Sequence, residues 1–254
     1  LYPSYEEIWF YESKRRMHYW LQAHEVAHPE TWIFYDRVQA HDFVAQAPLP
    51  LVFKTDFGSG AMGVRILHDR DKLHRLVNRC FRKGIVKAGG DRRDRQWGCI
   101  LLQAYLPQVK EWRMIRIGDA YMGYQKLQKG DYHSGSHAYA YGAPPTDLLD
   151  WVKTITDRGG FRSMALDVFV TPAGDFLVNE LQTTFKIHVQ DGLPMQDGKA
   201  GCFVYDQVGQ TWRFKAGDFC RNQLCNLRVQ DLLQQLNCSL VNEPTGAATQ
   251  PAMS

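Results

Sequence analysis

Residues 52–64, VFKTDFGSGAMGV, restrict the fold of this chain more than any other stretch, because they fit three nucleotide-binding signatures at once. Three glycines have the spacing G-x-G-x-x-G, the letters of the kinase metal motif overlap the first glycine, and a lysine stands four residues ahead of it. The residues concerned are Lys54, Asp56, Phe57, Gly58, Ser59, Gly60 and Gly63. Each signature needs a different structure around the glycines, so the flanking sequence decides among them.

The residues around the glycines argue against the common phosphate-binding motifs. A dinucleotide-binding loop leads into a helix, whereas Val64–Leu67 is largely apolar and predicts a strand. A Walker loop requires Gly-Lys-Ser or Gly-Lys-Thr, and neither occurs in the sequence. In protein kinases Asp-Phe-Gly follows the glycine loop, but here Asp56–Gly58 overlaps it. What remains is a glycine-rich β-hairpin over a triphosphate with Lys54 on its first strand, or else a solvent turn with an incidental lysine.

A second motif, His24-Glu-Val-Ala-His28, has the letters of the zinc-peptidase signature H-E-x-x-H. That chemistry needs both histidines on one face of a continuous helix, together with a third ligand. Pro29 follows His28 directly and breaks the helix there, and no third ligand with suitable spacing follows. We therefore interpret the two histidines as helix-end residues and do not expect zinc.

Composition places the chain among globular proteins. Its 254 residues are 44% apolar and 22% charged, and the net charge of +3 does not indicate a polyanionic partner. No stretch approaches the roughly 20 apolar residues of a membrane helix, and no signal peptide follows Leu1. The cysteines form no C-x-x-C pair, which is typical of free thiols in a reducing compartment. We expect a cytoplasmic protein that binds neither nucleic acid nor membranes, and a chain that was trimmed or has lost an upstream segment.

Hydrophobic periodicity and turn residues predict an α+β fold. Helices are expected at 12–25, 36–45, 69–82 and 146–157. Strands are expected at 31–35, 51–55, 64–67 and 100–106, and in two hairpins, 112–118 with 120–126 and 164–171 with 175–181. A loop is expected at 130–145, further strand-like segments at 198–205 and 210–219, and a disordered tail at 242–254.

The hairpin formed by residues 164–181 carries a candidate metal site. Asp167 and Glu180 lie on its adjacent strands, and Gln182 lies two residues past Glu180, hence on the same strand face. Two carboxylates and an amide oxygen suit Mg²⁺, which phosphates and water also ligate. Two acids beside apolar strand residues would be costly without a cation, although lone acids at strand ends are usually solvated. If the acids share a metal, Asp167→Asn and Glu180→Gln should abolish turnover with little loss of stability.

Taken in order, these motifs resemble the ATP-grasp superfamily over roughly residues 12–190. The glycine hairpin looks like its glycine loop, and Gln103-Ala-Tyr-Leu-Pro107 is similar to the hinge that holds adenine. The resemblance implies Glu111 as the acid that binds the ribose hydroxyls. The full set of nucleotide ligands that it implies is Lys14, Lys54, Gly58, Ser59, Gly60, Gly63, Gln103, Tyr105, Leu106 and Glu111.

The resemblance assigns the metal site as well, with two departures from the family pattern. It implies Asp167, Glu180 and Gln182 as the Mg²⁺ ligands, although Gln182 stands where the family usually has asparagine. Ala165 stands where an arginine is frequent, two residues before the first metal acid. Arg162, Lys126 or Arg113 would supply this charge instead.

The fold implied is an ATP-grasp fold, in which two α+β subdomains hold ATP between antiparallel sheets. It divides the chain into an N-terminal helical and linker segment, 1–49, a small subdomain, 50–107, a large subdomain, 108–241, and the tail, 242–254. The α/β domain that usually precedes this fold is expected to be absent or truncated, because few residues precede the glycine loop.

The activity implied is that of a carboxylate–amine or carboxylate–thiol ligase with ATP and Mg²⁺ as cofactors. Arg113 and Lys126 would bind the transferred phosphoryl group and the substrate carboxylate. His133 or His137, in a loop that covers the site, would assist deprotonation of the amine. The expected partners are a small-molecule carboxylate and an amine, with a homodimer left open. A small-molecule kinase on the same scaffold and a non-catalytic ATP-binding module are the alternatives.

Overall fold

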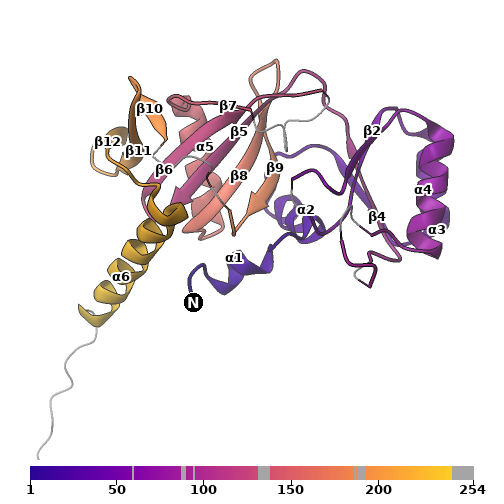
Figure 1. Ribbon diagram of the computed structural model, residues 1–254, viewed down its shortest axis with the longest axis horizontal. Coiled ribbons are helices and arrows are strands. Elements are labelled where there is room, and N and C mark those ends of the chain that lie inside the picture. Colours follow the sequence, from indigo (N-terminus) through magenta and orange to yellow (C-terminus); the bar gives the residue numbers. More distant parts are fainter. Residues whose placement is uncertain are drawn as a thin grey trace, which may run out of the picture.

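Two antiparallel sheets, a small one and a large one, organise the chain. The computed structural model describes residues 1–58, 60–86, 90–93, 95–130, 138–185, 187 and 193–241. In Figure 1 the small sheet with its two helices lies at the right, and the large sheet lies at the centre and left. None of the helices within these ranges is long and apolar enough to cross a bilayer.

The small sheet has the strand order β1-β4-β2-β3. Its strands are β1 (Thr31–Phe34), β2 (Leu51–Lys54), β3 (Val64–Leu67) and β4 (Ile100–Ala104), and α3 (Arg37–Gln46) and α4 (Arg70–Arg82) pack beside it. Asp69 caps α4 by accepting a hydrogen bond from the backbone of Lys72, which satisfies one of the free N–H groups of the first turn. Leu73 and Val77 on the apolar side of α4 share one buried cluster with Phe53 of β2.

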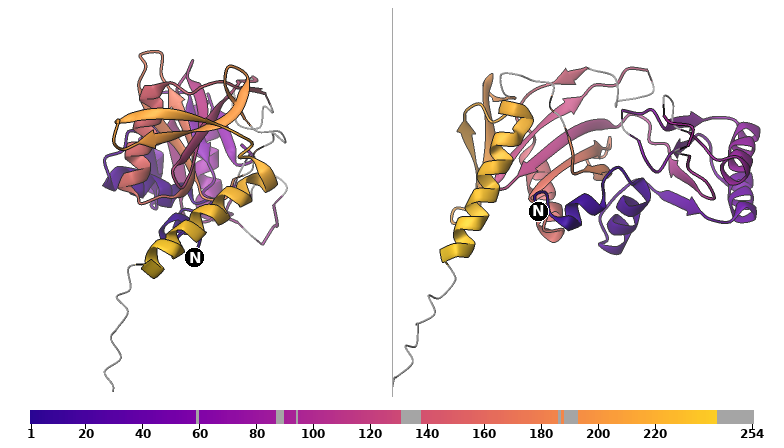
Figure 2. Two further views of the ribbon diagram at one scale, coloured as in Figure 1. Left: turned by 90° about the vertical axis from the view of Figure 1, so that its left-hand side faces the viewer. Right: turned by 60° about the horizontal axis from the view of Figure 1, so that its bottom comes forward.

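The large sheet has the strand order β10-β11-β6-β5-β8-β9, with β12 paired to β11 and β7 paired to β6. Its strands are β5 (Lys110–Ile117), β6 (Ala120–Lys126), β7 (Tyr139–Ala140), β8 (Ser163–Val170), β9 (Phe176–Gln182), β10 (Pro194–Gln196), β11 (Lys199–Asp206) and β12 (Thr211–Ala216). The remaining elements are α1 (Tyr5–Trp9), α2 (Lys14–Ala23), α5 (Thr146–Arg158), the 3₁₀ turn η1 (Arg221–Leu224) and α6 (Cys225–Val241). Figures 1 and 2 show α6 leading away from the sheet.

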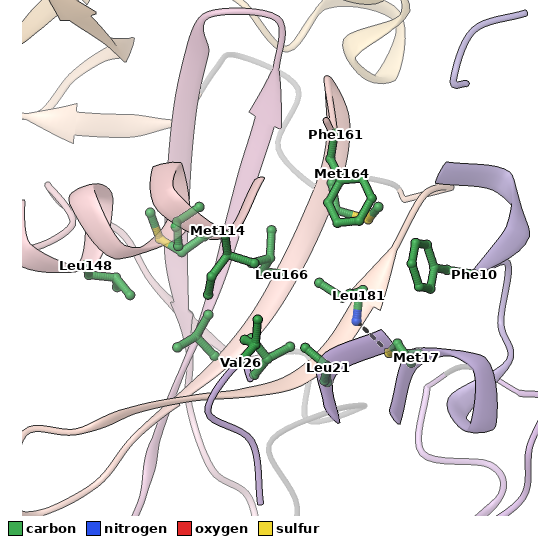
Figure 3. Close-up of a cluster of buried hydrophobic side chains, with 14 of the residues drawn as sticks. Phe10, Met17, Leu21, Val26, Met114, Leu148, Phe161, Met164, Leu166 and Leu181 are labelled. Carbon is green, nitrogen blue, oxygen red and sulfur yellow. Dashed lines mark hydrogen bonds between the residues drawn. The ribbon is translucent and has the colours of Figure 1, made fainter. Parts of the chain in front are cut away.

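The N-terminal residues are shared between the two sheets. Phe10, Met17 and Leu21 are buried in one cluster with Met114 and Leu181 of the large sheet, as Figure 3 shows. The segment 31–46, in contrast, belongs to the small sheet through β1 and α3. Residues 1–49, which we expected to be a separate helical and linker segment, are therefore divided between the two halves of the fold.

The glycine-rich stretch forms a β-hairpin, as the sequence predicted. β2 and β3 are antiparallel with Lys54 opposite Val64, and no helix follows the glycines. Gly63 lies so close to Thr55 that an added Cβ atom would fall 1.8 Å from its Oγ1 atom. Gly60 has φ +61°, in the left-handed region that favours glycine. The dinucleotide-binding interpretation, which needs a helix here, is thereby excluded.

The structure departs from the predicted elements in α1, α2 and α6 and in two short strands that were not predicted, β7 within the expected loop 130–145 and β10. The tail expected at 242–254 lies outside the described residues. The helix expected at 12–25 is limited to Lys14–Ala23, because Ser13 caps it and Glu25 has φ +51° just after its end. The helices α1 and α6 were not predicted. Only Glu7 of α1 is buried, and α6 carries exposed apolar side chains such as Leu233, so neither shows the one-sided pattern on which the prediction relied.

Candidate functional site

A cleft between the two sheets brings together most of the residues that the sequence singled out for nucleotide binding. It encloses roughly 910 Å³, its open mouth included. The predicted residues among its lining are Lys14, Lys54, Gly58, Gly60, Gly63, Gln103, Tyr105, Leu106, Glu111 and Glu180. Val52 and Ile66 of the small sheet and Val109 and Phe169 of the large half add apolar walls.

Lys54 places a nearly buried ammonium group in this cleft. It is the last residue of β2, which pairs with both β3 and β4, so the backbone that carries the side chain is fixed on both edges. Its Nζ atom donates a 2.8 Å hydrogen bond to Oδ1 of Asn179 on β9. Among the residues that the structure describes, no carboxylate oxygen lies within ion-pair distance of this nitrogen. Burial lowers the pKa of Lys54 to about 8.

Lys14 brings a second ammonium group from the first turn of α2. Its Nζ atom donates a 2.7 Å hydrogen bond to the carbonyl oxygen of Gly58 and lies 3.4 Å from Oε1 of Glu180. Asp56 ties this turn to the glycine hairpin, since its Oδ1 atom accepts hydrogen bonds from the hydroxyl of Ser13 and the backbone of Arg15. The aspartate of the Asp-Phe-Gly triplet is therefore a structural anchor between α2 and the glycine hairpin.

A β-bulge explains how two neighbouring residues of β9 both reach the cleft. Asp167 of β8 pairs with Glu180, but the next residue, Val168, pairs with Val178, which leaves Asn179 as an extra residue on β9. Side chains normally alternate between the two faces of a strand, and a bulge re-aims them. Asn179 and Glu180 accordingly both line the cleft. Asn179 was not among the predicted site residues, because a bulge leaves no mark in an alternation pattern.

Asp167 lies at the centre of a buried ion cluster and is only 1% exposed. Arg113 donates two parallel hydrogen bonds to its carboxylate, each 2.8 Å long, and Lys126 donates a third. Arg113 also donates to Oε1 of Gln182, at 2.9 Å. Burial alone would raise the pKa of Asp167, but the charges of Arg113 and Lys126 hold that pKa well below its usual range. In this arrangement the carboxylate of Asp167 and the amide oxygen of Gln182 both accept hydrogen bonds from Arg113.

Glu111 extends the same cluster toward the cleft. It lies opposite Lys126 in the β5–β6 register, and Nζ of Lys126 donates a 2.7 Å hydrogen bond to its Oε1 atom. Burial raises the pKa of Glu111, against the opposing effect of Lys126. Glu111 and Lys126 are 2% and 5% exposed, so this predicted ribose ligand is also part of the folded core.

The hinge segment lies where β4 ends. Tyr105 and Leu106 line the cleft directly after the last paired residue, Ala104, whose N–H group donates to the carbonyl oxygen of Glu30. The side chain of Gln103 donates a 2.9 Å hydrogen bond to Oγ1 of Thr31 on β1, which fixes its amide. The hinge therefore offers backbone groups and apolar surface at the end of the cleft away from Glu180.

Several predicted residues lie elsewhere. Ser59, His133 and His137 fall outside the described residues. Arg162, considered as a substitute for the arginine missing at Ala165, donates through Nε to Asp231 on α6 at 3.0 Å. His24 and His28 each place Nδ1 beside a nearby backbone carbonyl oxygen, and the described residues contain no cluster of three metal-ligating side chains.

Comparison with known proteins identifies the fold. No family model matches the sequence, and no curated protein matches it. A RimK-domain ATP-grasp protein from Sphaerobacter thermophilus DSM 20745 is 19% identical, with a TM-score of 0.51, over 69% of this chain and 61% of that one. A biotin carboxylase–βγ-ATP complex from Campylobacter jejuni is 14% identical, with a TM-score of 0.55, over 72% of this chain and 42% of that one.

A third structure, the biotin carboxylase domain of 2-oxoglutarate carboxylase from Hydrogenobacter thermophilus with MgADP, is 15% identical with a TM-score of 0.53. It matches 71% of this chain and 41% of the other. The chain thus belongs to the class of α+β proteins that enclose a cleft between two antiparallel sheets. Within that class it has the ATP-grasp fold, and it spans 41–61% of the length of these three proteins.

The residues in the cleft fit a nucleoside triphosphate. Lys54 has no carboxylate partner within the part of the chain that the structure describes, and a buried ammonium group without one is costly, so Lys54 favours an anionic ligand. Lys14 lines the same cleft. The oxygen ligands in the cleft also fit a Mg²⁺ ion that is bound chiefly through phosphates. Glu180 offers this ion a carboxylate, and Asn179 offers it an amide oxygen. Asp167 is less available to that set, because its carboxylate already accepts three hydrogen bonds from Arg113 and Lys126.

Proposed function

We propose that the chain is an ATP-dependent ligase that joins a carboxylate to an amine through an acyl phosphate and releases ADP and phosphate. The observation that carries the proposal is the pair of ammonium groups, Lys54 and Lys14, set beside Glu180 at one end of the cleft. Support at the level of the fold comes from the ATP-grasp structures above.

The apolar walls and the hinge account for the nucleoside end of the substrate. An adenine ring between Ile66 and Phe169 would find backbone donors and acceptors at Tyr105 and Leu106. Glu111 would accept hydrogen bonds from the ribose hydroxyls. The glycine hairpin would close over the phosphates with its backbone N–H groups.

The lysines account for the phosphate end. Lys54 and Lys14 would neutralise the α- and β-phosphates, and Glu180 would hold Mg²⁺, which supplies positive charge at the γ-phosphate when bound. A carboxylate oxygen of the substrate attacks the γ-phosphorus, and the bond to the ADP oxygen breaks. The amine nitrogen then attacks the acyl carbon, phosphate leaves with the C–O bond electrons, and the nitrogen loses a proton.

Arg113 and Lys126 are proposed to bind the anions of the substrate and of the transferred phosphoryl group. Both now donate to Asp167, so either an anion competes with that carboxylate or the cluster rearranges on loading. The same observation favours a second candidate, a non-catalytic ATP-binding module, in which the buried cluster only stabilises the fold.

Hydroxylamine trapping separates these functions. A ligase incubated with ATP, Mg²⁺ and a panel of amino acids and other small carboxylates forms a hydroxamate together with ADP, because hydroxylamine intercepts the acyl phosphate. A module binds ATP without releasing ADP. ADP release that depends on a hydroxyl substrate, with no hydroxamate, would identify a small-molecule kinase and refute the ligase.

A further inference from the structure

We propose that a second cavity, next to the phosphate end of the cleft, binds a small carboxylate with a short apolar chain. This inference rests on the proposed function and names a substrate subsite for it. It assigns the substrate carboxylate to this cavity, which Arg113 and Lys126 do not line, and leaves those two residues to the transferred phosphoryl group. The cavity encloses roughly 320 Å³ with its mouth and lies among α2, β1, β4 and β9. It shares Lys14, Lys54, Gln103 and Asn179 with the nucleotide cleft. It does not include Ile66, Phe169, Tyr105 or Leu106, the residues proposed above to contact the adenine ring.

The lining of this cavity has the chemistry of a site for a small amphipathic anion. One wall includes Lys14 and Lys54, whose ammonium groups lie at the border with the nucleotide cleft, beside Glu180 and Asn179 respectively. The rest includes Met17, Leu21 and Val178, which are apolar and buried. Among the described residues that line it, none is an aspartate or a glutamate. A small carboxylate matches this lining: its charged group would lie beside Lys14 and Lys54, and a chain of a few carbons would lie over the apolar side chains.

His18 supplies an independent sign of a ligand. His18 is one of the residues that line this cavity, and its Nδ1 atom is buried without a hydrogen-bond partner among the described residues. Buried polar atoms are nearly always hydrogen-bonded, so such an atom marks a place for a ligand or a water molecule. The neighbouring His28 ring lies 5.2 Å away, but its Nδ1 atom lies 2.6 Å from the carbonyl oxygen of Val26. A neutral His18 with its proton on Nδ1 would donate to a carboxylate.

The position of the cavity gives the inference its functional meaning. A carboxylate on the shared wall would lie beside the two lysines that are proposed to hold the phosphates. Phosphoryl transfer needs the attacking oxygen close to the phosphorus, and a preformed subsite provides that proximity. The apolar part of the lining, Met17, Leu21 and Val178, favours a short hydrocarbon chain on the carboxylate.

The experiment is a titration of the full chain with propionate as the probe, in the presence of a nonhydrolysable ATP analogue and Mg²⁺. Calorimetry should show saturable binding of propionate, and propanamide, its neutral isostere, should bind at least tenfold more weakly. His18→Leu and His28→Trp should each weaken propionate binding at least tenfold, with ATP-analogue affinity changed less than twofold. His24→Leu is the matched control, because His24 stacks on Trp20 outside the cavity and should leave propionate binding unchanged.

The possible failures are distinguishable. If the wild-type chain binds the ATP analogue but not propionate, or binds propanamide equally well, the inference is overturned and the proposed function stands. If the analogue itself does not bind, the proposed function fails. Nuclear Overhauser contacts from propionate to the methyl groups of Leu21, Leu101 and Val178 locate the probe without any substitution. Contacts to other methyl groups alone would overturn the assignment of the cavity.

Discussion

Lys54 of the small sheet and Asn179 of the large sheet, 125 residues apart in sequence, are joined by a 2.8 Å hydrogen bond from Nζ to Oδ1. The bond exists because the bulge at Asp167–Glu180 directs Asn179 into the cleft. An amide satisfies the buried ammonium group without neutralising it, so the positive charge of Lys54 stays available to an anionic ligand.

A carboxylate at position 179 should therefore compete with the nucleotide. Asn179→Asp is expected to weaken binding of a nonhydrolysable ATP analogue at least tenfold in the absence of Mg²⁺, because the new charge pairs with Lys54 and repels phosphates. Calorimetric titration measures this change. Gln234→Glu adds the same charge on the exposed side of α6 and should change the affinity less than twofold. Equal affinity in Asn179→Asp and wild type would contradict the role of the Lys54–Asn179 pair.

Nucleotide binding should take up a proton above pH 8. In the free chain burial lowers the pKa of Lys54 to about 8, and phosphate charges beside it would raise that pKa. Above pH 8 the free lysine is mostly neutral and the bound one charged, so affinity should fall as pH rises. Calorimetry at pH 8.5 in buffers with different ionisation enthalpies detects the uptake. Lys54→Arg, whose guanidinium stays charged, should abolish it, and an uptake that persists in this variant would assign the proton to another group.

Asp167→Asn should be strongly destabilising. The sequence suggested little loss of stability, because two neighbouring acids would repel each other, but the structure pairs Asp167 with Arg113 and Lys126. Removing one partner of a buried ion cluster costs about 3–5 kcal/mol. Urea unfolding should show a loss of this size. Glu180→Gln, at a partly exposed carboxylate 3.4 Å from Lys14, should cost much less, about 0–1 kcal/mol. Equal losses in the two variants would contradict the description of the cluster.

Glu111→Gln should remove the preference for ribose. Wild type should bind ATP about tenfold more tightly than 2′-deoxy-ATP, since a charge-assisted hydrogen bond contributes roughly 1.5–3 kcal/mol. The variant keeps the volume of the side chain but lacks the charge that also pairs with Lys126. Its two affinities should be equal. If the variant retains the wild-type ratio, Glu111 serves only as the partner of Lys126.

Local pattern was sufficient to predict the glycine hairpin and the paired strands. Val64–Leu67 after the glycines predicted a strand, and the register of β2 with β3 bears this out. The hairpin pattern also predicted that Asp167 and Glu180 lie on adjacent strands, which the β8–β9 pairing confirms, and the register sets them opposite each other. These features depend on residues close in sequence or on one hairpin.

Features that depend on distant contacts could not be predicted in this way. The partners of Asp167 come from β5 and β6, and only the sheet order reveals that they surround it. Asn179 reaches the cleft through a bulge, and periodicity predicts alternation there instead. That Nδ1 of His18 has no hydrogen-bond partner among the described residues depends on which side chains surround it, so only the folded chain reveals it.

The most direct test of the nucleotide-binding site is a titration of a nonhydrolysable ATP analogue with Mg²⁺ into wild type, Lys54→Met and Lys14→Met. Each loss of a charge-assisted contact should weaken binding about 10–100-fold. Lys54→Met should unfold at the same or a higher urea concentration, because it replaces a buried charge with an apolar side chain of similar volume. Lys153→Met, at a solvent-facing ion pair with Asp157 on α5, is the matched control and should bind like wild type. If both cleft variants bind the analogue as tightly as wild type, the nucleotide does not bind between these sheets.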